Sequence, residues 1–139
     1  MKTARVKWVE NLKFIGDAPS GHSILMDGPP TSGGDDCAVR PGELTLLALG
    51  GCTSIDIISI LKKMRVEFDS FEAVVDGEPA EEHPKVWVKL NVKYILKGKG
   101  IDRAKVEKAV SLSKDKYCAV SAMLGKTAEI SHEIIIQDS

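Results

Sequence analysis

Two of the three cysteines, Cys52 and Cys118, occupy positions where a thiol can become reactive. Cys52 follows Gly50 and Gly51, two residues of poor helix propensity, so a kink or a fresh helix start is expected there. Cys118 follows a polar segment in which Ser113 or Asp115 can cap a short helix. Free N–H groups and the dipole of a first helical turn favour a thiolate. Each cysteine is therefore a candidate nucleophile, with burial as a small hydrophobic residue as the alternative.

The third cysteine and one carboxylate have less reactive surroundings. Cys37 lies in a Gly-Gly-Asp-Asp loop with no basic neighbour nearer than Arg40, so we interpret it as incidental, although it can oxidise if exposed. Asp56 comes four residues after Cys52 and shares its helical face. Because its negative charge would oppose thiolate formation, a structural or capping role is expected for Asp56.

The histidines and the cysteine spacing indicate no metal site. His132 lies on the apolar face of a predicted strand and is interpreted as a core residue, whereas His22 and His83 are expected in loops or at strand ends. No pair of residues has the spacing of a known zinc motif. The sequence therefore predicts neither a metal nor another cofactor.

Length and composition indicate a single domain, residues 1–139, located in the cytoplasm. Nineteen Lys and Arg nearly balance twenty Asp and Glu, and no basic block is interleaved with aromatic residues, so nucleic acid is not an expected partner. The basic N-terminus has neither an apolar segment nor a small-residue cleavage site, so no secretory signal is expected. In a reducing compartment, cysteines are more often buried, metal-binding or catalytic than paired in structural disulfides.

The segment from Leu44 to Leu61 is the most apolar part of the chain. Its length is marginal for a membrane span, Asp56 lies inside it and two lysines close it, so a helix buried in protein is the better interpretation. A helix that is apolar all round needs cover on nearly every side, and 139 residues can hardly supply that cover. We therefore expect a homodimer and no membrane partner.

Hydrophobic periodicity predicts the elements that position the cysteines, and the fold class is α+β. Alternation at period two predicts strands over residues 4–8, 12–15, 22–27, 71–76, 86–96 and 128–136. A long helix is expected over residues 41–65, with Pro41 and Glu43 suited to its first turn. A capped helix from Asp102 and a second short helix ending at Gly125 complete the order βββ-α-ββ-αα-β.

Three segments together resemble the OsmC/Ohr family, specifically its YhfA-like branch. They are Pro41-Gly42-Glu43-Leu44, then Gly50-Gly51-Cys52 leading into residues 54–63, and Lys116-Tyr117-Cys118-Ala119-Val120-Ser121. The resemblance covers essentially the whole chain. It implies an OsmC-like fold and an intertwined homodimer with two mixed sheets around paired central helices, and it places the active sites at the subunit interface.

The resemblance also implies thiol-dependent reduction of organic hydroperoxides or hydrogen peroxide. Cys52 would attack the peroxide as a thiolate and become a sulfenic acid, which Cys118 would resolve as a disulfide. An external dithiol would then reduce the disulfide. A second hypothesis is a non-enzymatic dimer that binds a small apolar ligand or senses oxidants through the same thiols. A purely structural or assembly role is the third.

Arg40 and Glu43 are the candidates for activating Cys52. Family members use an arginine and a glutamate beside the first cysteine, but this chain has no arginine between Arg5 and Arg40, and its glutamate stands one place later. Along a straight helix Glu43 would lie about 13 Å from Cys52 and Arg40 about 18 Å. The two residues are therefore expected to act either through a kink at the glycine pair or across the dimer.

Overall fold

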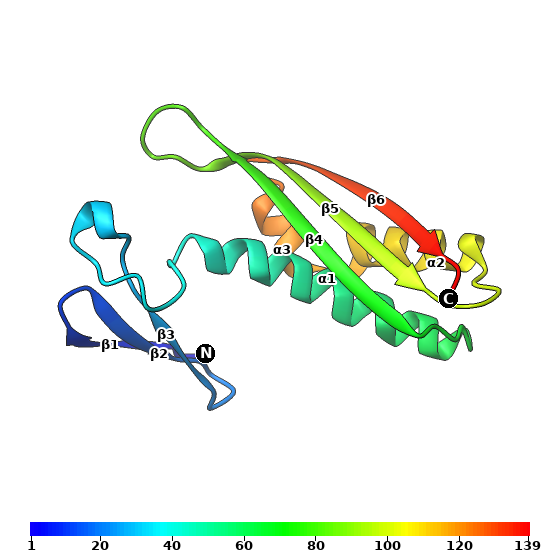
Figure 1. Cartoon of the computed structure of the whole chain (residues 1–139), viewed down its shortest axis with the longest axis horizontal. Helices are drawn as coiled ribbons and strands as arrows, with labels where there is room; N and C mark the ends of the chain where they lie inside the picture. The colour runs from blue at the N-terminus through cyan, green and yellow to red at the C-terminus, as the bar shows by residue number, and fades with distance from the viewer. The chain divides into compact units, whose positions relative to one another are not determined.

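The computed structural model describes residues 1–139 and contains two compact units, Met1–Thr45 and Leu46–Ser139 (Figure 1). The predicted order βββ-α-ββ-αα-β is confirmed, with a short 3-10 turn added after the third strand and a π-helical segment added between the last two helices. Each unit contains one three-stranded sheet.

The first unit is an antiparallel meander of β1 (Arg5–Glu10), β2 (Lys13–Asp17) and β3 (Ser23–Met26). The predicted hairpin is confirmed, and Asn11 makes its turn with a positive φ of 47°, a conformation that asparagine tolerates well. This sheet is wholly antiparallel within one chain, so the implied mixed pairing is confined to the second sheet.

The long helix α1 (Glu43–Lys63) begins two residues later than expected and runs unbroken through both glycines. The predicted interruption at Gly50-Gly51 is therefore wrong. Gly50 is buried, and a Cβ atom built on it would lie 3.0 Å from Val75 Cγ2. Glycine at this position permits close approach of the helix to the sheet and does not break the helix.

The second sheet has the order β4–β5–β6, built from β4 (Ser70–Pro79), β5 (Trp87–Lys97) and β6 (Glu129–Gln137). β4 pairs with β5 in antiparallel fashion, whereas β6 runs parallel to β5. The alternation predicted for β5 is confirmed, because Leu90, Val92, Tyr94 and Leu96 are all buried on one face.

The crossover between β5 and β6 contains α2 (Arg103–Leu112), the π-helical segment η2 (Ser113–Tyr117) and α3 (Ala119–Leu124). Asp102 caps α2 as predicted, accepting a hydrogen bond from the Ala104 N–H at 3.0 Å. The chain does not stop and restart at Ser113 or Asp115, since η2 continues directly from α2. Cys118 itself is the N-cap of α3, so the predicted capping residue is wrong.

The core of the second unit lies between one face of its sheet and the helices. Its helical members are Leu49, Ile57 and Leu61 of α1 together with Val106, Ala109 and Val110 of α2. α1 is long and apolar enough to cross a membrane by length and composition alone, a test that core helices of soluble proteins also pass. One side of α1, with Leu49, Ile57 and Leu61, is buried in this core.

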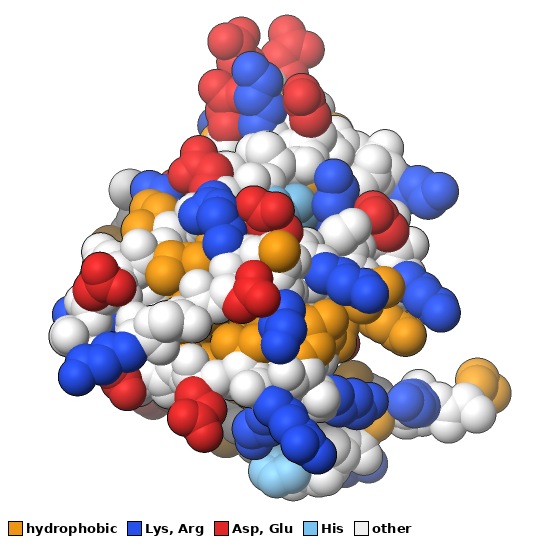
Figure 2. Space-filling model, turned by 90° about the vertical axis from the view of Figure 1, so that its right-hand side faces the viewer, with side chains coloured by type: hydrophobic (Ala, Val, Ile, Leu, Met, Phe, Trp, Pro, Cys, Tyr) orange, Lys and Arg blue, Asp and Glu red, His pale blue; other side chains and the backbone are white.

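Much of α1 nevertheless lacks cover within one chain. Only 28% of its apolar stretch is buried, and Leu47 and Ile55 are 59% and 71% exposed. On the face drawn in Figure 2, charged side chains of both signs are interspersed, and hydrophobic side chains are exposed between them. The uncovered apolar side chains of α1 itself, Leu47 and Ile55, are typical of an interface on a long helix.

Candidate functional site

Cys52 and Cys118 meet in the second unit although they are far apart in the sequence. Their Sγ atoms lie within 4.8 Å of each other, and the Cys118 side chain hydrogen-bonds the Cys52 thiol. Cys52 is half-buried and Cys118 is buried at 4% exposure, and neither forms a disulfide. The two thiols are close enough that side-chain rotation can bring them toward the S–S bond length of about 2.05 Å.

The first turn of α3 contacts both thiols. The Ser121 N–H donates to Cys118 Sγ at 3.3 Å, and the Val120 N–H donates to the Cys52 thiol. Cys52 is the tenth residue of α1, so the prediction that its own helix begins there is wrong. The backbone donor of Cys52 comes instead from the helix that Cys118 caps.

The surroundings of Cys52 oppose its ionisation overall. Burial, followed by the hydrogen bond with Cys118, raises the pKa of the Cys52 thiol, and the negative charge of Asp56 adds to the effect. The Val120 N–H favours the thiolate but does not compensate. The largest influences on the pKa of Cys52 are burial and the hydrogen bond with Cys118, whereas reactive cysteines commonly have a cation nearby.

Asp56 is held beside the cysteines by a hydrogen bond across the fold. Its Oδ2 accepts from the Ser113 hydroxyl at 2.9 Å, and Ser113 is almost fully buried at the start of η2. This contact agrees with the structural role expected for Asp56. It also fixes the carboxylate near the thiols, since the nearest carboxylate oxygen lies within 4.8 Å of both sulfur atoms.

Sequence spacing did not reveal this three-residue cluster as a group of possible metal ligands. Cys52, Asp56 and Cys118 bring two sulfur atoms and one carboxylate oxygen together, all within 4.8 Å of one another. The four-residue spacing of Cys52 and Asp56 on one helical face was a usable signal. The contribution of Cys118 depends on tertiary structure and could not be read from spacing.

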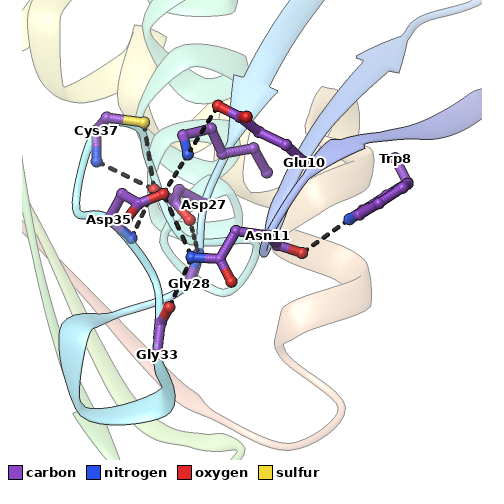
Figure 3. Close-up of polar contacts among 9 residues, drawn as sticks. Trp8, Glu10, Asn11, Asp27, Gly28, Gly33, Asp35 and Cys37 are labelled. Carbon is purple, nitrogen blue, oxygen red and sulfur yellow. Dashed lines mark hydrogen bonds and ion pairs between the residues drawn. The ribbon is translucent and has the colours of Figure 1, made fainter.

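Cys37 is exposed, but a buried carboxylate holds it (Figure 3). Asp27 Oδ2 accepts hydrogen bonds from the Cys37 N–H and thiol, both at 3.2 Å, and Asp27 also binds the N–H groups of Gly28 and Asp35. The hydrogen bond to Asp27 raises the pKa of Cys37, with burial and the carboxylate charge acting in the same direction. These contacts agree with the interpretation of Cys37 as a residue of little reactivity.

Arg40 and Glu43 contact groups at the start of α1. The Arg40 guanidinium pairs with Asp36 at 2.6 Å and donates to the Ala38 carbonyl at 3.0 Å. Glu43 Oε1 accepts from the Arg40 N–H at 2.8 Å, as in a capping box. The kink at the glycine pair, one of the two routes by which these residues were expected to reach Cys52, is missing.

His132 is half-buried and pairs with the fully buried Tyr94 of the core. The two rings stack with centroids 5.9 Å apart, and His132 Nδ1 lies 3.1 Å from the Tyr94 hydroxyl. The other ring nitrogen, Nε2, is buried without a partner, so the expectation of a satisfied core histidine holds for only one of its two nitrogens. Burial raises the pKa of Tyr94 to about 12 and lowers that of His132.

Fold and sequence together define the class of protein. Residues 33–133 match the model of the OsmC-like protein family, so the chain belongs to the OsmC-like family. Within it the chain falls in the YhfA-like branch, as it is 46% identical to protein YhfA of Escherichia coli K12 over 93% of each chain.

Solved structures have the same fold. A protein from Aquifex aeolicus, described as hypothetical, is 30% identical and covers 98% of this chain and 97% of its own, with a TM-score of 0.80. An organic hydroperoxide resistance protein OsmC from Legionella pneumophila has a TM-score of 0.71 and covers 97% of this chain and 96% of its own. The Legionella protein is only 12% identical, so its likeness to this chain concerns the fold.

Proposed function

We propose that the chain is a thiol-dependent peroxidase that reduces organic hydroperoxides or hydrogen peroxide, with Cys52 as the peroxidatic and Cys118 as the resolving cysteine. The observation that carries the proposal is the contact between the two thiols, which come from α1 and the cap of α3. Membership of the OsmC-like family, which includes organic hydroperoxide resistance proteins, supports it.

The reaction needs two thiols in contact. The Cys52 thiolate attacks one peroxide oxygen, the O–O bond breaks, and the alcohol or water leaves once it has taken up a proton. The Cys118 thiol then attacks the resulting sulfenic acid, forming the disulfide and releasing water. An external dithiol returns both cysteines to the reduced state. A contacting second thiol protects the sulfenic acid from irreversible oxidation.

The proposal includes a homodimer and a role for Arg40 and Glu43 across it. The uncovered apolar face of α1 supports a second copy of the chain as partner. Because α1 is unbroken, Arg40 and Glu43 are proposed to serve a site from the opposite subunit. We place this single-domain protein in the cytoplasm, where dithiol reductants are available.

A second candidate function is favoured by one specific observation. Burial, followed by the hydrogen bond with Cys118, raises the pKa of Cys52, and the negative charge of Asp56 adds to that effect. A thiol in this state is a weak nucleophile, as expected for a dimer that binds a small ligand or senses oxidants slowly. A measured thiol pKa of Cys52 above that of free cysteine, together with no peroxide turnover, would favour this second function over the peroxidase.

The peroxidase is tested by three cysteine variants. Cys52→Ser is expected to abolish consumption of cumene hydroperoxide and hydrogen peroxide in the presence of dithiothreitol. Without added dithiol, Cys118→Ser should complete one turnover and form no disulfide, because no resolving thiol remains. The matched control Cys37→Ser should turn over like the parent protein. Peptide mass analysis of the oxidised parent should locate a loss of two hydrogens at Cys52 and Cys118, and equal rates in all variants would contradict the proposal.

A further inference from the structure

The cluster of Cys52, Asp56 and Cys118 has a donor set that exceeds what peroxide chemistry needs. A peroxidase uses two thiols, and a carboxylate beside them raises the pKa of the attacking one. Asp56 is nonetheless held in place by the Ser113 hydroxyl. Two thiols and a fixed carboxylate are instead the ligand types of a thiophilic divalent metal ion.

The distances fit a tetrahedral site after small movements. The two Sγ atoms and a carboxylate oxygen of Asp56 all lie within 4.8 Å of one another. With Zn–S bonds of about 2.3 Å and Zn–O bonds of about 2.1 Å, tetrahedral ligand atoms stand roughly 3.5–3.8 Å apart. Closing the site would therefore need the donor atoms to approach one another by about 1 Å.

The surroundings of the cluster also suit a metal. Buried liganding carboxylates are usually oriented by hydrogen bonds from a second layer of residues, as Ser113 orients Asp56. Asp56, whose negative charge acts on the Cys52 thiol, would attract a cation. A divalent ion would offset the negative charge that two thiolates and a carboxylate bring together.

We propose that Cys52, Asp56 and Cys118 form a binding site for a thiophilic divalent metal ion of the zinc class. The ion takes two thiolate sulfurs and one carboxylate oxygen from the chain, which leaves the fourth tetrahedral position for water. Each thiol loses its proton to the solvent as its sulfur–metal bond forms, so binding releases two protons per ion. No oxidation or reduction takes place.

The metal site goes beyond the peroxidase and does not depend on it. Metal binding requires only that the three donors converge and that both thiols are reduced. When the ion is bound, both sulfurs are occupied, so metal-loaded protein is expected to react slowly with peroxide. A disulfide between Cys52 and Cys118 removes both sulfur donors, so oxidised protein should not bind the ion. At any one time the site would thus either bind a metal ion or react with an oxidant.

The site is tested with Co²⁺ as a spectroscopic probe on reduced, metal-free, full-length protein under argon. We expect one Co²⁺ per chain, with thiolate-to-cobalt charge-transfer absorption in the near ultraviolet and the visible bands of a tetrahedral ion, and Zn²⁺ should displace it. Cys52→Ser and Cys118→Ser should each lose about half of the charge-transfer intensity. The matched control Cys37→Ser should retain all of it.

Two further variants separate metal binding from general disruption. Asp56→Asn replaces the carboxylate by a neutral, weaker amide donor and should weaken Co²⁺ binding while leaving both sulfur bands in place. Ser113→Ala removes only the hydrogen bond that orients Asp56, and it should weaken binding roughly 10- to 100-fold. Binding that is unchanged in the double variant Cys52→Ser/Cys118→Ser would overturn the proposal, as would the absence of saturable binding in the parent.

A measurement on the unaltered protein avoids any question of folding. Alkylation with N-ethylmaleimide is followed by peptide mass analysis with and without Zn²⁺, and Cys37 serves as the internal reference. Zn²⁺ is expected to slow the alkylation of Cys52 and Cys118 but not that of Cys37. If Zn²⁺ changes the alkylation of none of the three cysteines, the proposed site is wrong. Peroxide turnover of the metal-free protein is measured separately, so failure of the peroxidase would leave the metal result intact.

Discussion

At the scale of single residues, two carboxylates, Asp27 and Asp56, lie beside cysteines in different surroundings and both raise the pKa of the neighbouring thiol. Asp27 is buried and binds Cys37 directly, whereas Asp56 is tied to Ser113 and lies beside Cys52. Each carboxylate opposes ionisation of its neighbouring thiol. Exposure alone is therefore a poor guide to which cysteine of this chain reacts first.

The first residue-scale prediction concerns Cys37. Although exposed, Cys37 should react with iodoacetamide near pH 8 more slowly than a free cysteine of ordinary pKa, about 8.5. Asp27→Asn removes the charge that raises the pKa of Cys37 and should therefore speed its alkylation. Asp36→Asn, a matched change at the neighbouring loop carboxylate, should alter the rate little. Rates are measured by peptide mass analysis, and no acceleration in Asp27→Asn would contradict the argument.

The site residues illustrate what could be predicted from sequence. The two glycines before Cys52 were interpreted as a helix start, but α1 runs through them. Gly50 is needed instead for close packing of the helix against Val75. The contact between Ser113 and Asp56 joins residues far apart in the sequence. No local pattern encodes such a contact, so the orientation of Asp56 could not be foreseen.

At the scale of elements, periodicity predicted strands well because burial on one face imposes alternation directly. The buried residues of β5, Leu90, Val92, Tyr94 and Leu96, lie on the expected face, but Val86 at the start of the predicted series is 41% exposed and precedes the strand. The region before Cys118 was harder to predict, because Ser113 and Asp115 are good capping residues on local grounds. Tertiary contacts instead draw Ser113 into the protein interior, and the chain continues through a π-helical segment. Such segments occur often at functional sites.

His132 of β6 stacks on Tyr94 of β5, and its titration predicts a pH dependence of stability. Burial, followed by the charge of Lys114, lowers the pKa of folded His132 below its ordinary value of 6.5. Below that value the unfolded chain binds a proton at this histidine that the folded chain does not bind. Stability contributed by neutral His132 is therefore present above about pH 6.5 and is lost as the pH falls toward the folded pKa.

This dependence is checked by urea unfolding at about pH 7.5 and about pH 5.5, on either side of the ordinary histidine pKa. The loss of unfolding free energy between the two values should be smaller for His132→Gln than for the parent protein. His22→Gln, a matched change at an exposed histidine, should show the same loss as the parent. An identical pH dependence in His132→Gln and the parent would show that His132 does not titrate as argued.

At the scale of the whole molecule, a charge placed on the exposed face of α1 is expected to weaken the dimer. Ile55 is 71% exposed in one chain, and covering it in a dimer would contribute up to about 1.5–3 kcal/mol per subunit. A symmetric interface contains the residue twice, so Ile55→Lys should raise the dimer dissociation constant by roughly 100-fold or more. Analytical ultracentrifugation measures the change.

The control for the dimer is a matched substitution away from α1. Val86→Lys replaces another exposed aliphatic residue by lysine, at the turn before β5, and should leave the dissociation constant within a few-fold of the parent value. A monomeric parent protein, or a dimer equally stable in Ile55→Lys, would show that the apolar face of α1 is not covered by a second copy.

The parallel pairing of β5 with β6 has a consequence for synthesis of the protein. Parallel strands need a long crossover, and here the crossover carries Cys118 while Cys52 precedes both strands. During N-to-C synthesis, β6 is the last strand to emerge, and pairings between distant segments form slowly. In the nascent chain, Cys52 therefore lacks the neighbouring Cys118 thiol and is open to irreversible oxidation. This lasts until the final strand docks and the Cys118 sulfur comes into place.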